Sequence, residues 1–289
     1  MATPIATSVL TQAEYGEWNS LVAQSPQGSP YSTPEYLAAL CSATGGTYRI
    51  LGVRKGPDLV GGAALYEQRD ERGTRLSPRP LLYYNGIVLR EHPMRYPSQR
   101  TARILETTKA LESALAAGGY ASITLKSRST LIDARSFLAE GWSVRSGYTY
   151  VVQLGDLKQA WERVEQNLRR LVNRCTQEGL QFTDDDDFES FFRMHAALAG
   201  RKGTGLYLPA ASFGNFFTAL RAADLCRLFH ARLPSGQSIS AQLVLTGKHA
   251  VSHSVAAAAD PAHMSSGRRP SCAGRCSKGS PRWAMWRTT

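Results

Sequence analysis

The sequence has no long apolar segment and few cysteines, and these absences exclude several classes of protein. No apolar run approaches the length of a bilayer-spanning helix, so we expect no membrane span. The opening sequence, MATPIATSVL, lacks a basic n-region and a long apolar h-region, which argues against a signal peptide. Five scattered cysteines fit a reduced protein better than a disulfide scaffold. We therefore expect a cytoplasmic protein.

Metal-ligating patterns are also weak. Cys272 and Cys276 form a single pair of closely spaced cysteines, and no second pair matches it. His263 stands alone in the sequence and does not complete a zinc shell. We therefore expect no metal.

The formal net charge of +11 is unevenly distributed along the chain. Residues 268–289 contain many basic residues and no acidic residue. These basic residues are Arg268, Arg269, Arg275, Lys278, Arg282 and Arg287. The rest of the chain carries only a modest positive excess, which argues little for nucleic acid as a partner.

One long amphipathic helix is predicted between Asp156 and Gly179. Apolar residues are spaced alternately by three and four positions, which places them on one side of a helix. They are Leu157, Trp161, Val164, Leu168, Leu171, Val172 and Cys175. Asp156 can cap the start of this helix, and Gly179 can end it in a left-handed conformation.

A second, polar stripe runs beside the apolar face of this helix. Its members are Arg163, Asn167, Arg170 and Arg174. At 100° per residue these four side chains lie close to one line. Three guanidinium groups in such a line can bind a carboxylate, a phosphate or a pyrophosphate. The alternative is a solvated basic face.

The order of predicted elements is similar in the two halves of the chain, because each contains helices followed by three strands. In the first half the helices begin at Thr11 and Thr33, and the strands span 48–54, 59–67 and 81–89. In the second half helices begin near Asp187 and Ser212, after a strand at 148–153, and the strands span 225–233, 238–245 and 249–256. This order predicts an α+β fold with two halves, residues 1–147 and 148–267, followed by an aberrant basic tail, residues 268–289.

Several diffuse motifs, taken in order, resemble one protein family. They are Trp18-x-x-Leu21, the stretch SPQGSPYSTPEYL at 25–37, NLRRL at 167–171, Arg201-Lys202-Gly203, LFHA at 228–231 and AAADP at 257–261. Together they resemble the FemAB/FemX-like branch of the GNAT acyltransferase superfamily. The resemblance implies two tandem GNAT-like halves with mixed, mostly antiparallel sheets flanked by helices.

The resemblance also implies a function, the transfer of an acyl or aminoacyl group to an amine. Family members use acyl-CoA or aminoacyl-tRNA as donors, and some modify peptidoglycan precursors, so tRNA, a small-molecule amine and such precursors are the expected partners. The chemistry needs a base for the amine proton and donors for the oxyanion. His253, in the predicted strand 249–256, is the candidate base, although a lone strand histidine is often structural.

The same resemblance assigns candidate residues for binding an anionic donor or acceptor. These are Arg163, Asn167, Arg170, Arg174, Arg201 and Lys202. Arg201 and Lys202 fall in a predicted loop, and a solvated loop is the alternative interpretation of that pair.

A phosphate-binding signature of GNAT enzymes, [QR]-x-x-G-x-[GA], is missing after both groups of strands. Where the second half should contain it, the chain instead has a segment rich in Arg, Ser, Gly and Pro without helical periodicity. We therefore hypothesise that residues 268–289 are read in a shifted frame, which would leave the second half incomplete, poorly soluble and inactive. A basic tail that belongs to the protein is the alternative.

Two other functions stay open at this stage. A fold of this type without catalytic activity would be a binding module that uses the basic helix to hold an anionic ligand. A nucleic-acid-binding protein would use the basic tail, and its affinity would fall steeply with salt.

Overall fold

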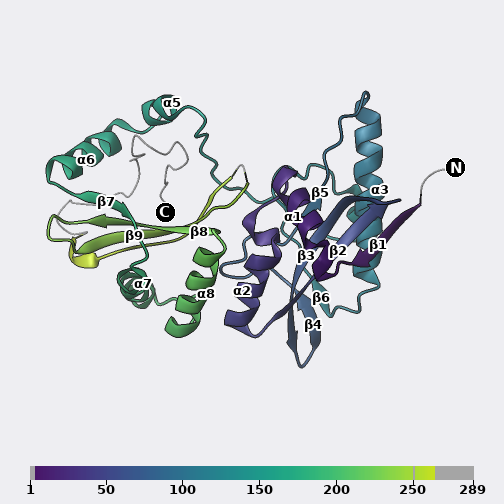
Figure 1. Ribbon diagram of the computed structural model, residues 1–289, viewed down its shortest axis with the longest axis horizontal. Helices are drawn as coiled ribbons and strands as arrows, with labels where there is room; N and C mark the ends of the chain where they lie inside the picture. The colour runs from purple at the N-terminus through teal and green to yellow at the C-terminus, as the bar shows by residue number, and fades with distance from the viewer. Residues whose placement is uncertain (1–3, 250, 264–289) are drawn as a thin grey trace. The chain divides into compact units, whose positions relative to one another are not determined.

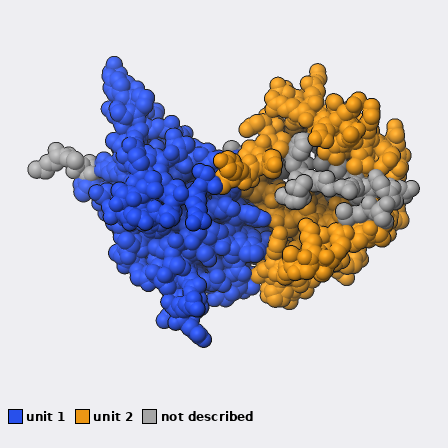
Figure 2. Space-filling model, turned by 180° about the vertical axis from the view of Figure 1, so that it is seen from behind, with its two compact units in different colours: residues 1–146, 218–223, 247–251 blue, residues 147–217, 224–246, 252–289 orange. Residues whose placement is uncertain are grey.

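The computed structural model describes residues 4–249 and 251–263, and these residues form two compact units (Figure 2). Unit 1 comprises residues 1–146, 218–223 and 247–251, and unit 2 comprises residues 147–217, 224–246 and 252–289. The predicted basic tail, residues 268–289, lies outside the described residues. The hypothesis that this tail is read in a shifted frame is therefore untested. The boundaries 1–147 and 148–267 stay a prediction.

Unit 1 is built on a six-stranded sheet with the order β1-β2-β3-β4-β6, in which β5 also pairs with β3 (Figure 1). The strands are β1 (Ile5–Val9), β2 (Thr47–Lys55), β3 (Asp58–Asp70), β4 (Gly73–Leu76), β5 (Ile87–Leu89) and β6 (Ser122–Ile123). The helices are α1 (Tyr15–Gln24), α2 (Pro34–Thr44), α3 (Pro97–Ala116) and α4 (Arg135–Ala139). All pairs are antiparallel except β4 with β6, so the predicted mixed, mostly antiparallel sheet is confirmed.

Local signals set the starts of the first two helices as the sequence predicts. The backbone N–H of Thr11 donates to the Glu14 carboxylate at 2.8 Å, which is one half of a capping box. The Thr33 hydroxyl accepts from the Tyr36 N–H at 3.3 Å, and Pro34 occupies the first turn of α2. Both helices then bury their apolar faces.

Two consecutive glycines of β3 show that α1 and α3 cover opposite faces of this sheet. A Cβ at Gly61 would lie 2.8 Å from the Thr107 side chain of α3, and a Cβ at Gly62 would lie 2.6 Å from the Trp18 ring of α1. Successive residues of a strand point to opposite faces. Glycine is therefore required here for close approach of the two helices rather than for a turn.

Replacing Gly62 with alanine is expected to destabilise the protein by about 1–3 kcal/mol, because the added methyl meets the Trp18 ring and the Leu51 carbonyl. Urea unfolding of the variant measures this loss. The matched control is Gly16→Ala in α1, where a Cβ meets nothing within 4 Å. This control should gain roughly 0.5–1 kcal/mol from helix propensity, and an equal loss in both variants would contradict the packing argument.

Unit 2 contains a four-stranded antiparallel sheet with the order β10-β9-β8-β7. Its strands are β7 (Gln181–Asp184), β8 (Cys226–Arg232), β9 (Ser238–Leu245) and β10 (His253–Ala259). The helices along this part of the chain are α5 (Leu157–Glu162), α6 (Gln166–Gln177), α7 (Phe188–Lys202) and α8 (Ala210–Ala222). Helix α7 packs on β9 and β10. The α+β class predicted from the sequence is confirmed.

The predicted single helix from Asp156 to Gly179 is wrong, because it is two helices. Asp156 caps α5 by accepting from the Gln159 N–H at 3.0 Å, and Gly179 has a left-handed φ of 78° after α6, so both ends agree with the sequence. Between them the chain turns at Val164, whose side chain is buried, and Glu165 has a non-helical ψ of 140°. Burial of Val164 in this turn favours the break over a straight helix. No residue of α6 is fully buried.

One predicted strand is absent from the described residues, and a second is shifted. Residues 148–153 pair with no described strand, and Tyr148 and Tyr150 are 98% and 97% exposed. Apolar alternation alone does not make a strand, since the backbone needs a pairing partner. The predicted strand 249–256 forms instead as β10, and His249 lies in the preceding loop.

None of the described helices is both long enough and apolar enough to cross a bilayer.

Candidate functional site

The irregular strand β10 is the feature of unit 2 best suited to chemistry. Ser254 lies opposite Val244 of β9, but the next paired residue is Ala256, opposite Leu243. Val255 is therefore an inserted residue, a β-bulge, and its side chain is buried. A bulge leaves the extra residue outside the regular ladder and re-aims the neighbouring groups. The backbone at Val255 is thus available for a role other than sheet pairing.

His253 is the first residue of β10, two positions before the bulge, and is partly buried. Its main chain pairs with Leu245. The neighbouring Ser254 hydroxyl accepts a hydrogen bond from the amide of Gln242, a buried side chain of β9. The histidine therefore lies beside a strand distortion whose Ser254 is held by a partly buried polar contact.

The polar stripe predicted on one helix is divided by the break between α5 and α6. Arg163 ends α5 and donates to Gln159 Oε1 at 2.7 Å, so it does not share a helix with the other three residues. Asn167, Arg170 and Arg174 follow one side of α6, and all three are exposed. Arg174 is 3.9 Å from Glu178, a distant ion pair.

The other predicted basic pair lies at the end of α7 rather than in a loop. Arg201 and Lys202 form the last turn of this helix, which stops at Gly203 with a left-handed φ of 64°. Both side chains are exposed. The partial negative charge at a helix C-terminus favours cations there. This effect favours Arg201 and Lys202 in the last turn of α7 without any role in ligand binding.

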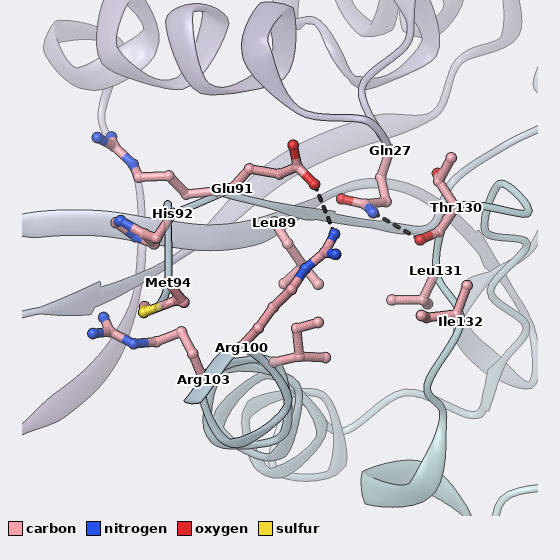
Figure 3. Close-up of a pocket in the computed structure, with 12 residues that line it drawn as sticks. Gln27, Leu89, Glu91, His92, Met94, Arg100, Arg103, Thr130, Leu131 and Ile132 are labelled. Atoms are coloured by element: carbon pink, nitrogen blue, oxygen red, sulfur yellow. Dashed lines mark hydrogen bonds and ion pairs between the residues drawn. The ribbon is translucent and has the colours of Figure 1, made fainter. Parts of the chain in front are cut away.

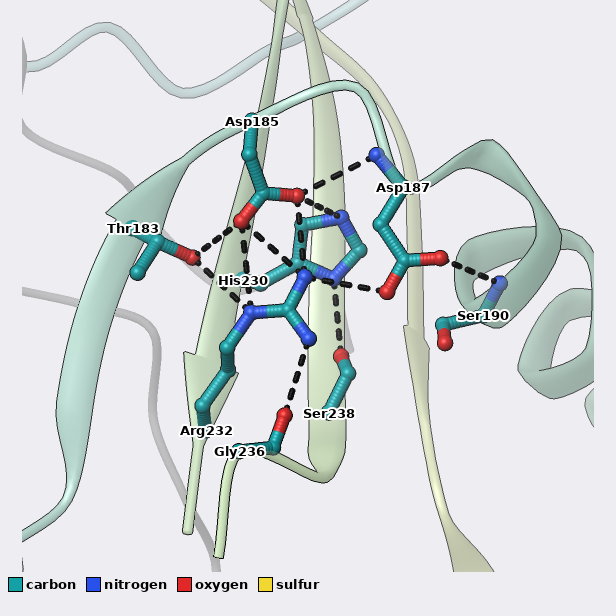
Figure 4. Close-up of polar contacts among 8 residues, drawn as sticks. All are labelled: Thr183, Asp185, Asp187, Ser190, His230, Arg232, Gly236 and Ser238. Carbon is teal, nitrogen blue, oxygen red and sulfur yellow. Dashed lines mark hydrogen bonds and ion pairs between the residues drawn. The ribbon is translucent and has the colours of Figure 1, made fainter. Parts of the chain in front are cut away.

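A polar network that the sequence did not reveal joins β7, β8 and the start of α7 (Figure 4). The Arg232 guanidinium donates to Asp185 at 2.9 Å and to Asp187 at 2.9 Å. Asp187 also caps α7 by accepting from the Ser190 N–H at 3.0 Å. His230, fully buried, hydrogen-bonds through Nδ1 with the Ser238 hydroxyl at 2.7 Å. The sequence predicted only that a helix begins near Asp187.

Asp185, Asp187 and His230 also have the spacing of a metal site, since one ligand atom of each lies within 4.8 Å of the others. The guanidinium of Arg232 already bonds both carboxylates. This cation supplies the positive charge that a metal ion would bring, so the residues do not fit a metal. The cluster is best interpreted as a structural ion-pair network.

The charges of this network follow from its contacts. Burial raises the pKa of Asp185, but hydrogen bonds from Thr183 and Arg232 outweigh it, and the pKa lies below its ordinary value. The pKa of Asp187 is lowered for similar reasons, against burial, by bonds from Ser190 and Arg232. Burial first, and then the charge of Arg232, lower the pKa of His230. The histidine is therefore neutral at pH 7.

Replacing Arg232 with methionine should leave two facing carboxylates without their counter-ion. The free energy of unfolding at pH 7 should fall by about 1–3 kcal/mol, less than for a fully buried pair because both carboxylates are partly exposed. Lowered carboxyl pKa values stabilise the fold above the unfolded pKa of about 4 and lose that effect as the pH falls further. The loss should therefore shrink at pH 3.

Urea denaturation at pH 7 and pH 3 measures both effects. Arg193→Met, an exposed arginine of α7, is the matched control and should change stability little at either pH. An Arg232→Met loss that is the same at both pH values would contradict the network as described.

Two cavities lie near charged side chains, one in each unit. The cavity in unit 2 has a volume of about 320 Å³ and is lined by Cys175 and Glu178 at the end of α6, together with Leu233, Pro234 and Ile239. This volume is at the lower limit for a small-molecule site. The end of the basic helix α6 therefore borders a cavity of useful size.

The cavity in unit 1 is much smaller, about 40 Å³ (Figure 3). Arg103 and His92 lie on one side of it, and Arg100 reaches across to bond the Glu91 carboxylate at 2.7 Å. Burial and the nearby Arg103 lower the pKa of His92. A volume of this size suits one or two water molecules and is too small for an acyl donor.

Comparisons with known proteins found a family model and a solved structure that this chain resembles. Residues 162–271, which include β7 to β10 with α7 and α8, match the family model described as an acetyltransferase (GNAT) domain. The chain is also similar to a solved structure titled "Crystal structure of FemX", with a TM-score of 0.63 and 13% identity over 88% of this chain and 80% of that chain. No curated protein matches the sequence significantly. At this identity the likeness shows the fold, and the predicted FemAB/FemX-like GNAT fold is confirmed.

Proposed function

We propose that the protein transfers an acyl or aminoacyl group to an amine, because residues 162–271 match the family model of a GNAT acetyltransferase domain and the fold is similar to that of FemX. The single observation that best supports the proposal is the bulge at Val255, which lies inside the matched domain. It leaves a backbone N–H outside the regular sheet ladder. Such a group is suited to bind a carbonyl oxygen that becomes negatively charged.

In this mechanism the amine attacks the activated carbonyl of the donor, and a C–N bond forms. The Val255 N–H donates to the oxyanion of the tetrahedral intermediate. His253 accepts the proton of the attacking amine. The intermediate then collapses with cleavage of the thioester C–S bond of an acyl-CoA or the ester C–O bond of an aminoacyl-tRNA, and the leaving group takes up a proton.

We also propose that exposed cations bind the anionic part of the donor or acceptor. Candidates on the first two helices of unit 2 are Arg163, Asn167, Arg170 and Arg174, and those at the end of α7 are Arg201 and Lys202. The supporting observation is that α6 presents its polar stripe to solvent and ends beside the cavity of about 320 Å³. Arginine suits this role, since it binds phosphate and carboxylate groups in a bidentate manner.

An assay of donor consumption tests the proposal. The protein is incubated with a series of acyl-CoAs or aminoacyl-tRNAs, with and without amines that include small molecules and peptidoglycan precursors. We expect release of free thiol or deacylated tRNA that depends on the amine. Tight binding of a donor or acceptor without any consumption, lost in Arg170→Gln, would instead support a catalytically silent binding module.

A further inference from the structure

Two cations of unit 1 lie two residues apart in the sequence, and neither pairs with an acidic side chain among the described residues. They are Lys126 and Arg128, which follow β6. The Lys126 ammonium lies 5.5 Å from the Tyr83 ring centre and 5.9 Å from that of Tyr84. Arg128 donates to the Gly28 carbonyl at 2.6 Å. In the part of the chain that the structure describes, no carboxylate pairs with either cation.

The environment of Arg128 makes this lack of a counter-ion costly. Its side chain is partly buried, and burial lowers the pKa of the guanidinium. The nearby Tyr84 hydroxyl acts in the opposite direction and raises that pKa. A desolvated cation without a counter-ion is unfavourable, and an anion that supplies the missing charge would gain that energy on binding.

The segment that holds these cations is fixed in place by Asn85, a buried residue. Its Nδ2 donates to the Thr124 carbonyl at 2.9 Å, and its Oδ1 accepts from the Lys126 N–H at 2.8 Å. Gly86 lies against Ser127, where a Cβ would approach its Oγ to 2.3 Å. The cations are thus positioned by the backbone before any ligand arrives, which favours binding.

The tyrosines beside the cations belong to an unusual stretch of backbone. Leu81 has a φ of 68°, a left-handed conformation that leucine rarely adopts. The Tyr36 hydroxyl donates to its carbonyl and holds it in place. Residues in such conformations cluster at functional sites. Two positions later Tyr83 is 44% exposed, so its ring offers an open face next to Lys126.

From these observations we propose that Tyr83, Tyr84, Lys126 and Arg128, here called the cationic tyrosine patch, bind the oxyanion of a small ligand. The two cations hold a phosphate or carboxylate group, and an apolar or aromatic moiety of the ligand lies on the Tyr83 ring. This binding site belongs to unit 1 and does not depend on the transfer activity proposed for unit 2.

Calorimetric titration of the full chain with phenyl phosphate, benzoate and inorganic phosphate tests the patch. We expect phenyl phosphate or benzoate to bind more tightly than inorganic phosphate, and the comparison of the first two tells a phosphate ligand from a carboxylate ligand. Lys126→Gln and Arg128→Gln should each weaken binding about tenfold, the usual size of a charge-assisted hydrogen bond. Lys109→Gln, an exposed lysine of α3, should not change it.

Nuclear magnetic resonance of His249 supplies a second readout in the unmodified protein. Burial and the charge of Arg128 lower the pKa of His249 to about 4. An anion on Arg128 should raise this pKa, whereas ligand bound elsewhere should leave it unchanged. No binding of any of the three probes, or binding that Lys126→Gln leaves intact, would overturn the proposal. If Arg128→Gln lowers stability but leaves ligand binding unchanged, the arginine has only a structural role through its bond to the Gly28 carbonyl, and the proposal is wrong for this residue.

Discussion

Replacing His253 with alanine is expected to lower the rate of acyl transfer at saturating donor by about 10²–10⁴-fold, the usual contribution of a general base. The amine would then lose its proton to water instead of to a positioned imidazole. Stability should change much less, because His253 is only partly buried at the start of β10. Single-turnover kinetics with a saturating donor measure the rate of the chemical step.

The control for this experiment is His92→Ala, which removes a partly buried histidine of unit 1, outside the matched residues 162–271. It should leave the rate unchanged. Imidazole added to the solution should partly restore His253→Ala if the missing group is a base. A full rate in His253→Ala would make this residue a structural histidine and leave the base unassigned.

Replacing Val255 with proline should lower the rate by about 10²–10³-fold, the usual cost of losing one oxyanion donor. Proline lacks the backbone N–H that we assign to the oxyanion. The substitution should be tolerated structurally, because proline is found at bulges and on edge strands. Among the described residues β10 pairs only with β9.

Val255→Ala is the matched variant, since it removes most of the side chain but keeps the N–H. It should lose some stability, because the Val255 side chain is buried, yet retain most of the rate. Circular dichroism of both variants separates misfolding from loss of the donor. Equal rates in Val255→Pro and Val255→Ala would contradict the assignment of the Val255 N–H as the oxyanion donor.

The parts of the fold that the sequence predicts are those that short-range chemistry decides. Thr11 with Glu14, and Thr33 with Pro34, mark helix starts because the groups that cap a helix lie within one turn of its end. Gly179 marks a helix end for a comparable reason. The strands predicted at 48–54 and 59–67 form as β2 and β3.

The errors arise where distant contacts override a local pattern. The apolar spacing of 156–179 fits one helix, but burial of Val164 in a turn divides it and separates Arg163 from Arg170. Tyr148 and Tyr150 alternate like a strand, but no described strand pairs with them. Neither outcome can be read from a window of neighbouring residues.

The candidate site shows the same division. A histidine in a strand of the second half is visible from the sequence, but the bulge beside it depends on the register of β9 against β10. Arg232 forms ion pairs with Asp185 and Asp187, which precede it in the chain by 47 and 45 residues. The missing counter-ion of Arg128 is likewise a property of the folded chain.

The most direct test of the central claim, that unit 2 is an acyltransferase, is the mass of the acceptor amine after incubation with an isotopically labelled acyl donor. The account predicts an amide product whose mass rises by one labelled acyl group in exchange for one amine hydrogen. Formation of this product should be strongly reduced in Val255→Pro. An acceptor of unchanged mass with every donor class, from a protein that is folded and binds the donor, would contradict the account.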